Sequence, residues 1–305
     1  NHEGSLETAV ELADCALRNG AEVIKHQTHI ISDEMSNEAR EVIPGNADVS
    51  IMEIMDRCAL NEHDERMLMQ HISSNGGIFI STPFSRAAAD RLHNYPFVRY
   101  VARLGKPMIV STGMNSIESL RPTVQIMREH SVPFALLHCT NIYPTDPELV
   151  RLNAMEELAD AFPDAVVGLS DHSLTNYPCI GAVALGASIL ERHFTDSYSR
   201  PGPDISCSMD GPGLAQLIEA SRIVHAARGS GKGPIPEEAA TIAFAFASVA
   251  VTGAVKAGEI LTESNIFPMR PAGGDFGVAD YDSLLGRRAS RDLEPGTQLR
   301  KSDVL

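Results

Sequence analysis

Residues 165–195 read AVVGLSDHSLTNYPCIGAVALGASILERHFT, and this stretch decides the fold. Residues 165–172 and 187–195 are short apolar runs that predict buried strands, and residues 177–185 between them predict a helix. Two strands joined through a helix run parallel in one sheet. Because both strands are almost continuously apolar, we expect helices to cover the sheet.

The same alternation continues along the chain in both directions. Further strands are predicted at residues 21–29, 77–84, 107–113 and 133–140, and helices at residues 6–19, 51–59, 62–74, 85–92, 95–104, 116–129, 153–162 and 214–228. The pattern predicts an α/β fold, either a TIM (β/α)8 barrel or an open doubly wound sheet. Polar residues gather at the carboxyl ends of the strands, which favours the barrel because barrel active sites lie at that end.

The strand count is two short of an eight-stranded barrel. One further strand would precede residue 1, and the other would fall between the predicted helices 85–92 and 95–104. Only His93 and Asn94 separate those two helices, which is too little for a strand with its loops. We therefore expect the working protein to contain further residues at both places, in addition to these 305.

A second, smaller domain follows the predicted barrel. Residues 1–228 form the barrel domain, residues 229–246 are a linker that is rich in Gly, Pro and Glu up to residue 238, and residues 247–305 form a separate module. Within that module, residues 256–266 align with residues 294–304 at a constant offset of 38 residues. Two copies of one short motif predict a small, pseudo-symmetric and mostly β module.

The composition excludes several classes of protein. The 25 Lys and Arg against 40 Asp and Glu give a net charge of −15, which argues against a nucleic-acid partner but allows an anionic small substrate at a locally positive site. The five cysteines are widely spaced without a C-x-x-C pair, which is typical of reduced thiols. No apolar stretch is long enough to span a membrane. We expect a cytoplasmic protein without a membrane partner.

Two histidines are candidate metal ligands. His172 and His193 stand at the ends of consecutive predicted strands, beside Asp171 and Glu191. Imidazoles at adjacent strand ends, with positions left for oxygen ligands, suit Mn, Fe, Co or Zn. The alternative is that one or both are hydrogen-bonded structural histidines.

A second group of strand-end residues carries hydroxyl groups and a positive charge. Lysine, hydroxyls and backbone N–H groups near helix N-termini form a typical phosphate-binding site. A single Ser or Thr at such a place could equally cap the next helix, but the group together favours a shared anion site. It consists of Lys25, Ser81, Thr82, Ser111 and Ser170.

Distinctive motifs run along the whole chain. They are NHEGS at 1–5, IKHQTH at 24–29, PGNAD at 44–48, STPFSRA at 81–87, STGMNS at 111–116, HCTNIYP at 138–144, GLSDH at 168–172, LERHF at 190–194 and RPGPD at 200–204. In this order they resemble the motifs of the bacterial sialic acid synthases. The module at residues 247–305 is similar to the antifreeze-like (SAF) domain of that family.

The resemblance implies a reaction and a site. The family condenses phosphoenolpyruvate with N-acetylmannosamine and water to give N-acetylneuraminate and phosphate, on a TIM barrel that binds a divalent metal, usually Mn²⁺, with Mg²⁺ or Co²⁺ as alternatives. It implies His172 and His193 as metal ligands, with Lys25 and Tyr143 as catalytic residues. The residues that would bind phosphoenolpyruvate are Lys25, Thr82, Ser111, Asn141 and Ser170. The residues that would contact the sugar are Gln27, Asn46, Tyr143 and Asp204, together with Arg270 from the other protomer of a domain-swapped homodimer.

Other functions fit many of the same residues. A synthase of a related nonulosonate, such as legionaminic acid made from a 2,4-diacetamido-6-deoxy sugar, would share nearly all the motifs. A metal-dependent aldolase using pyruvate is a different enzyme class and would release no phosphate. A non-catalytic sugar- or anion-binding barrel gains weight only if the two strands are truly missing. Family members carry a strand of the form Tyr-Lys-Ile-Gly-Ser-Gly-Glu between the third and fourth helices, and this chain lacks it.

Overall fold

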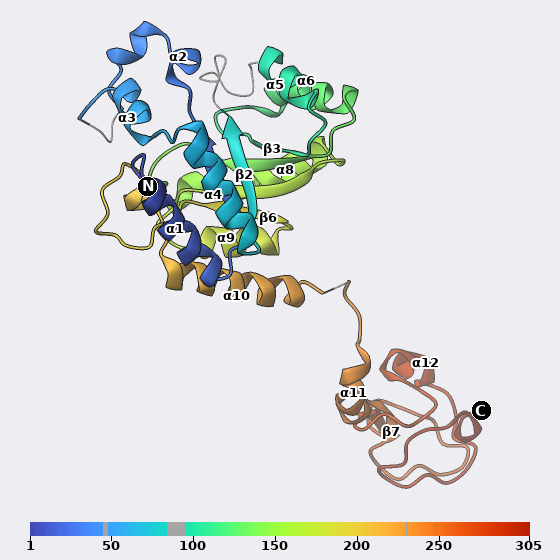
Figure 1. The fold of residues 1–305 in the computed structure, drawn as a ribbon. Coiled ribbons are helices and arrows are strands. Elements are labelled where there is room, and N and C mark those ends of the chain that lie inside the picture. Colours follow the sequence, from blue (N-terminus) through green and yellow to red (C-terminus); the bar gives the residue numbers. More distant parts are fainter. Residues whose placement is uncertain (45–47, 84–94, 230) are drawn as a thin grey trace. The chain divides into compact units, whose positions relative to one another are not determined.

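A computed structural model describes residues 1–44, 48–83, 95–229 and 231–305 of the chain (Figure 1). The chain forms two compact units, residues 1–229 and residues 230–305, and each is described by itself.

The described residues of the first unit form six strands in two parallel sheets. The four-stranded sheet has the order β3-β4-β5-β6, and β1 pairs with β2 in a separate two-stranded sheet. All six predicted strands are therefore present, and the prediction of a parallel α/β fold is confirmed. Their bounds are β1 Val23–Thr28, β2 Ile78–Pro83, β3 Met108–Ser111, β4 Phe134–Cys139, β5 Val166–Asp171 and β6 Ile189–Arg192.

The described strands do not close into a ring. Among the described residues no strand pairs with the outer edge of β2 or of β3, so a break in the sheet separates them. This break lies in the part of the chain where the strand count runs short. The predicted helix 85–92 lies outside the described residues. The closed eight-stranded barrel remains a prediction.

Helices cover the outside of the strands in the first unit (Figure 1). Polar side chains cap several helix N-termini: Ser5 accepts a hydrogen bond from the Thr8 N–H, and Asp210 accepts one from the Gly213 N–H. Helix α1 packs against α4 and α10, and α9 packs against α10. The helices are α1 Leu6–Arg18, α2 Ile31–Glu34, α3 Ile51–Cys58, α4 Glu62–Ser74, α5 Tyr95–Ala102, α6 Ile117–Glu129, α7 Pro147–Val150, α8 Ala154–Ala161, α9 Tyr177–Ala184 and α10 Gly211–Ala227, with the 3-10 turns η1 Asn37–Arg40 and η3 Ile205–Cys207.

Strand β4 lies at the centre of the core. All six of its residues are buried, as expected for a central parallel strand covered on both sides. Leu136 packs with Val124 and Met127 of α6, while Leu169 of β5 packs with Cys179 and Ala182 of α9. This packing fixes the positions of β4, β5 and β6 relative to one another, and their carboxyl ends carry many of the predicted site residues.

The second unit is small and mostly irregular or β. It contains the antiparallel pair β7 (Ser248–Val251) and β8 (Ile266–Met269), the helices α11 (Ala239–Ala245) and α12 (Tyr281–Leu284), and the 3-10 turns η4 (Pro236–Glu238), η5 (Val278–Asp280) and η6 (Lys301–Asp303).

The two repeats, which are 38 residues apart in the sequence, form equivalent hydrogen bonds in the second unit. The Thr262 N–H donates to Asn265 Oδ1 at 2.8 Å, and the Arg300 N–H donates to Asp303 Oδ2 at 2.9 Å. The turn glycines Gly258 and Gly296 have φ angles of 81° and 84°. The predicted pseudo-symmetry therefore holds at the level of individual turns.

No helix in the described parts of the chain combines the length and the apolar character needed to cross a bilayer. The five cysteines form no disulfide bond.

Replacing Gly168 by Ala should destabilise the first unit. An added Cβ would lie 2.4 Å from the backbone oxygen of Ile189 and 2.6 Å from Leu137 Cδ2, so β5 and β6 would have to separate. We expect a loss of about 1–3 kcal/mol in urea unfolding, as in other overpacked cores. Gly253→Ala is the control because nothing lies within 4 Å of its added Cβ. Equal stability of both variants would contradict the close approach of β5 and β6.

Candidate active site

The register between β5 and β6 sorts their residues onto two faces. Ser170 lies opposite Glu191, and Asp171 lies opposite Arg192. Because side chains alternate along a strand, Ser170 and Glu191 point to one face and the Asp171–Arg192 pair points to the other. His172 and His193 follow directly and return to the first face. One register therefore brings a hydroxyl, a carboxylate and two imidazoles together.

Lys25, Ser170 and Glu191 form a hydrogen-bonded group. Lys25 Nζ lies 2.8 Å from Glu191 Oε1, and the Ser170 hydroxyl donates to the same oxygen at 2.8 Å. Burial alone would raise the pKa of Glu191, but the nearby Lys25 charge and these hydrogen bonds outweigh burial and lower it. Lys25 comes from β1 and Glu191 from β6, so the two separate sheets face a common interior.

The two predicted metal ligands lie next to each other. The ring centroids of His172 and His193 are 5.3 Å apart. His172 Nδ1 lies 3.1 Å from the backbone oxygen of Thr140, which can only accept a hydrogen bond, so Nδ1 carries the proton and the Nε2 lone pair is left for a ligand.

Both imidazoles are held neutral. Burial is the main cause that lowers the pKa of His172, and burial lowers the pKa of His193 to about 4 against the opposing charge of Asp204. Asp204 Oδ2 lies 3.5 Å from His193 Nδ1. Neutral imidazole is the form that binds metals, so the state of these histidines fits the predicted metal site.

Tyr143 packs against both histidines. Its ring centroid is 4.1 Å from that of His172 and 5.8 Å from that of His193. Burial, together with the surrounding Cys139, Asp204, Cys207 and Glu191, raises the pKa of its phenol. At neutral pH Tyr143 is therefore a hydrogen-bond donor and not a base.

The side chain of Asn141 fits beside Gly113 because a glycine has no Cβ. Its Oδ1 accepts a hydrogen bond from the Cys139 thiol at 3.4 Å, and a Cβ at Gly113 would lie only 1.7 Å from this oxygen. Cys139 is buried, and burial raises its pKa to about 11, so the group beside Asn141 is a neutral thiol.

The remaining predicted residues are not part of this cluster. Gln27 and Thr82 lie opposite each other on β1 and β2, and Ser111 ends β3, but these positions alone give them no hydrogen bond or ion pair to the histidines or to Lys25. Asn46 lies outside the described residues. Arg270 is exposed in the second unit, directly after β8. Their roles stay predictions.

The opposite face of the β5–β6 pair stabilises the loop that carries His172. Arg192 Nη1 lies 3.1 Å from Asp171 Oδ2, and both side chains are almost fully buried. Arg192 also donates to the backbone oxygens of Thr175 at 2.8 Å and of Ser173 at 2.6 Å. Arg192 thus fixes the chain on both sides of His172 without entering the site.

Sequence reasoning assigned no role to two residues that lie close to Lys25 or His193. Glu191 holds Lys25 and Ser170, and Cys207 lies with His193 and Asp204 in one group of potential ligand atoms. The signal for Glu191 was its position two residues before His193, which places both on one face of a strand. Cys207 follows the RPGPD motif by three residues, and nothing in that spacing points to the histidines.

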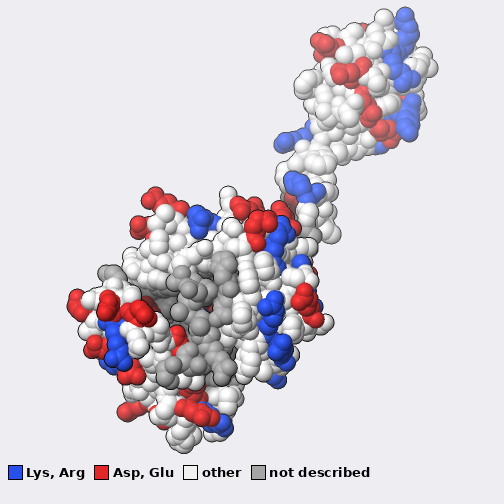
Figure 2. Space-filling model, turned by 90° about the horizontal axis from the view of Figure 1, so that it is seen from above, with Lys and Arg blue, Asp and Glu red and all other residues white. Residues whose placement is uncertain are grey.

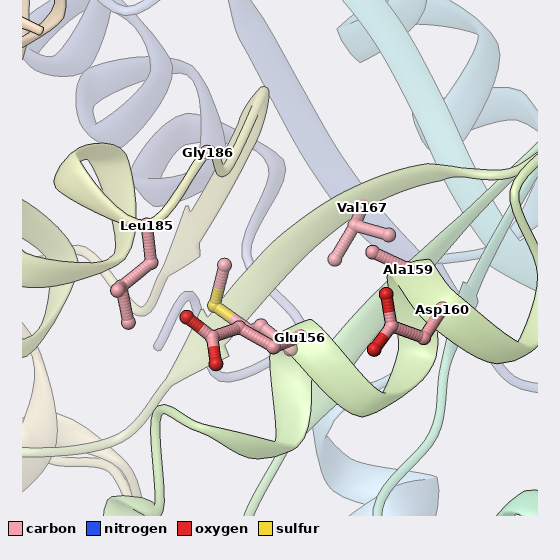
Figure 3. Close-up of a pocket in the computed structure, with 7 residues that line it drawn as sticks. Glu156, Ala159, Asp160, Val167, Leu185 and Gly186 are labelled. Atoms are coloured by element: carbon pink, nitrogen blue, oxygen red, sulfur yellow. The ribbon is translucent and has the colours of Figure 1, made fainter. Parts of the chain in front are cut away.

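Two pockets among the described residues lie elsewhere. One, of about 290 Å³, is lined by residues at the amino-terminal end of β5 and before β6, among them Val167 and Gly186, with Glu156 and Asp160 of α8 (Figure 3). It opens at the end of the strands opposite the cluster. Figure 2 shows Lys and Arg interspersed with Asp and Glu over the visible face of each unit.

Comparison with known proteins identifies the family. The sequence profile of the NeuB family matches residues 12–233, and that of the SAF domain matches residues 246–305. The chain belongs to the NeuB family. This confirms the resemblance drawn from the sequence motifs.

Several NeuB relatives have assigned activities. The chain is 31% identical to N,N'-diacetyllegionaminic acid synthase of Legionella pneumophila, covering 98% of this chain and 90% of the relative. It is 31% identical to pseudaminic acid synthase of Campylobacter jejuni, covering 99% and 94%. The crystal structure of N-acetylneuraminic acid synthetase from Leptospira borgpetersenii in complex with citrate superposes with a TM-score of 0.72 at 25% identity, covering 79% of this chain and 87% of that one.

The names of these relatives agree on the class of product but not on the individual product. All three are named as synthases of nonulosonic acids, but of three different ones. The alignments with both curated relatives extend over 325 residues, more than the 305 of this chain, so the relatives contain residues that this chain lacks.

Replacing Glu191 by Gln should reduce stability in a pH-dependent way. The folded protein favours the Glu191 carboxylate, so its contribution is present above the unfolded pKa of about 4.3 and is lost as pH falls through the lower folded pKa. We expect the variant to be less stable by about 1 kcal/mol at pH 7 in urea unfolding, with the difference from wild type shrinking as pH falls below the unfolded pKa.

The matched control is Glu118→Gln, which removes an exposed pair with Arg121 on α6. It should change stability little at either pH. A difference for Glu191→Gln that stays constant from pH 7 to about pH 3 would contradict the assigned ion pair.

Proposed function

We propose that this chain is a phosphoenolpyruvate-dependent nonulosonic acid synthase, which condenses phosphoenolpyruvate with N-acetylmannosamine and water to give N-acetylneuraminate and phosphate. The observation that carries the proposal is the group of Lys25, Ser170 and Glu191 beside two neutral histidines and Tyr143, in a chain of the NeuB family.

The Lys25 group is suited to hold phosphoenolpyruvate. The Lys25 ammonium has three N–H donors, and Glu191 accepts one of them, so two remain for anionic oxygens of the substrate. Glu191 keeps the flexible lysine chain in one place before the substrate arrives. Asn141 and the hydroxyl groups of Thr82, Ser111 and Ser170 are proposed as further donors.

The histidine group is suited to hold the sugar aldehyde and a metal ion. A divalent cation held by His172 and His193, with Mn²⁺ expected and Mg²⁺ or Co²⁺ as alternatives, would supply Lewis-acid polarisation of the sugar carbonyl. Tyr143 and Asp204 border the same space, so they are proposed to orient the sugar, together with Gln27 and Asn46. The protonated Tyr143 phenol can donate a hydrogen bond to the sugar carbonyl oxygen.

The reaction then follows from positioning. Carbon 3 of phosphoenolpyruvate attacks the aldehyde carbon, water adds at carbon 2, and the tetrahedral intermediate loses phosphate through cleavage of its C–O bond. Lys25 and the hydroxyl donors stay fixed around the departing phosphate, where negative charge increases. Because Glu191 pairs with Lys25 before substrate binds, the Lys25 ammonium is held in place without being an unpaired charge.

A second sugar is a candidate substrate, and the relatives support it equally. The legionaminic acid synthase relative makes the 2,4-diacetamido-6-deoxy precursor an alternative to N-acetylmannosamine. Phosphate release should be measured with phosphoenolpyruvate, Mn²⁺ and each sugar in turn. Release with one of them would support the synthase and identify its sugar. Release with neither would contradict the proposal, and condensation of free pyruvate without phosphate would indicate an aldolase.

Removing either histidine should abolish metal-dependent turnover. We expect His172→Ala and His193→Ala each to lower phosphate release more than about 100-fold, since loss of even an outer partner of a metal ligand costs 10–100-fold. Far-UV circular dichroism should stay unchanged. His63→Ala, an exposed histidine of α4, is the control and should retain full activity. Activity retained in both site variants would overturn the metal assignment.

The complete site is proposed to need a second copy of the chain and a closed barrel. Arg270 of the SAF unit is proposed to reach the sugar site of the other protomer in a domain-swapped homodimer. We also propose that the two sheets form two sides of an eight-stranded barrel, supported by the Lys25–Glu191 contact between them.

Mixing two inactive variants tests the shared site. Arg270→Ala protomers keep His193, and His193→Ala protomers keep Arg270, so a mixed dimer would contain one intact site. After refolding an equal mixture we expect roughly a quarter of wild-type turnover, because half of the dimers are mixed and each has one intact site of two. No recovery would contradict the swapped arrangement.

A further inference from the structure

A second set of potential metal ligands shares His193 with the proposed site. One ligand atom from each of His193, Asp204 and Cys207 lies within 4.8 Å of the other two. His172 is not a member of this set. Nothing in the proposed reaction uses the Cys207 thiol, which is buried and 1% exposed.

The backbone fixes these three residues next to each other. Asp204 precedes the 3-10 turn η3, and its backbone oxygen accepts hydrogen bonds from the Cys207 thiol at 3.3 Å and from the Ser208 hydroxyl at 2.8 Å. The Met209 N–H donates to the His193 backbone oxygen at 2.9 Å. The turn therefore lies against the end of β6, and the three side chains stay together without any ligand.

The chemistry of this set selects a thiophilic metal. Thiolate with imidazole and carboxylate is a zinc donor set, whereas Mn²⁺ and Mg²⁺ prefer oxygen ligands. Zinc bonds of 2.0–2.3 Å in a tetrahedral site place ligand atoms about 3.6 Å apart. The three ligand atoms now lie within 4.8 Å of one another, so they would have to move about an ångström closer together. Rotation of the side chains can produce this movement.

We propose that His193, Asp204 and Cys207 form a zinc site that overlaps the proposed active site and inhibits the enzyme when filled. On binding, the thiol releases its proton to solvent, and the neutral imidazole binds through a lone pair. The zinc charge is then balanced by one thiolate and one carboxylate, so the complex is neutral, whereas the Cys207 thiolate beside Asp204 without zinc would place two negative charges together. Water or substrate completes the fourth position.

Inhibition follows from the shared residues. Zinc bound to the Cys207 set takes His193 from the proposed Mn²⁺ pair and Asp204 from the proposed sugar site. This consequence rests on the proposed function, but zinc binding itself does not.

Cobalt spectroscopy tests the binding directly. Co²⁺ takes the place of zinc and gives an intense near-ultraviolet charge-transfer band only when a thiolate is a ligand. We expect this band when Co²⁺ is added to the full-length protein, its loss in Cys207→Ser and its displacement by Zn²⁺. Cys139→Ser is the matched control, since Cys139 is also buried near the site, and it should keep the band. No band in wild type, or an unchanged band in Cys207→Ser, would overturn the site.

Inhibition is measured separately as Zn²⁺-dependent loss of phosphate release from the Mn²⁺-loaded protein. In Cys207→Ser, which should keep its Mn²⁺-dependent activity, the zinc concentration for half inhibition should rise at least about tenfold. Equal inhibition of wild type and variant would overturn the inhibitory role. If the protein releases no phosphate with any sugar, the proposed function fails, and the cobalt band alone decides the zinc site.

Discussion

The parallel register of β5 against β6 is the constraint on which the candidate site depends. With Ser170 opposite Glu191, the following histidines necessarily stand side by side on the same face. A shift by one residue would exchange the two faces and put Asp171 and Arg192 into the interior. Gly168 contributes to this register because its missing Cβ allows the Ile189 backbone to approach β5 closely.

The two faces of the β5–β6 pair have different tasks. The outer face contains the buried Asp171–Arg192 ion pair, which contributes little net stability but leaves a costly unpaired charge if one partner is lost. Because Arg192 also bonds the loop after β5, it fixes the backbone around His172. The inner face contains groups that are kept neutral or paired, such as the imidazoles and the Lys25–Glu191 pair.

The sequence predicted the strands and the family well because those signals are local. Six apolar runs appear as six parallel strands, with β5 ending at Asp171 and the predicted strand ending at His172. The repeat seen in the sequence at a 38-residue offset also appears in the structure, with Gly258 and Gly296 at equivalent turns. Contacts between distant elements were not predictable in this way. The role of Glu191 depends on Lys25, which comes from another sheet, and Cys207 meets His193 only through the turn η3.

The central claim is that one strand register presents His172 and His193 together to a single metal ion. Pulsed electron paramagnetic resonance of the Mn²⁺-loaded protein tests this claim most directly, because the spectrum reports nitrogen nuclei bonded to the metal. The account predicts couplings to two histidine nitrogens in the wild-type protein and to one in each single histidine variant. A wild-type spectrum without nitrogen coupling, or one unchanged by both substitutions, would contradict it.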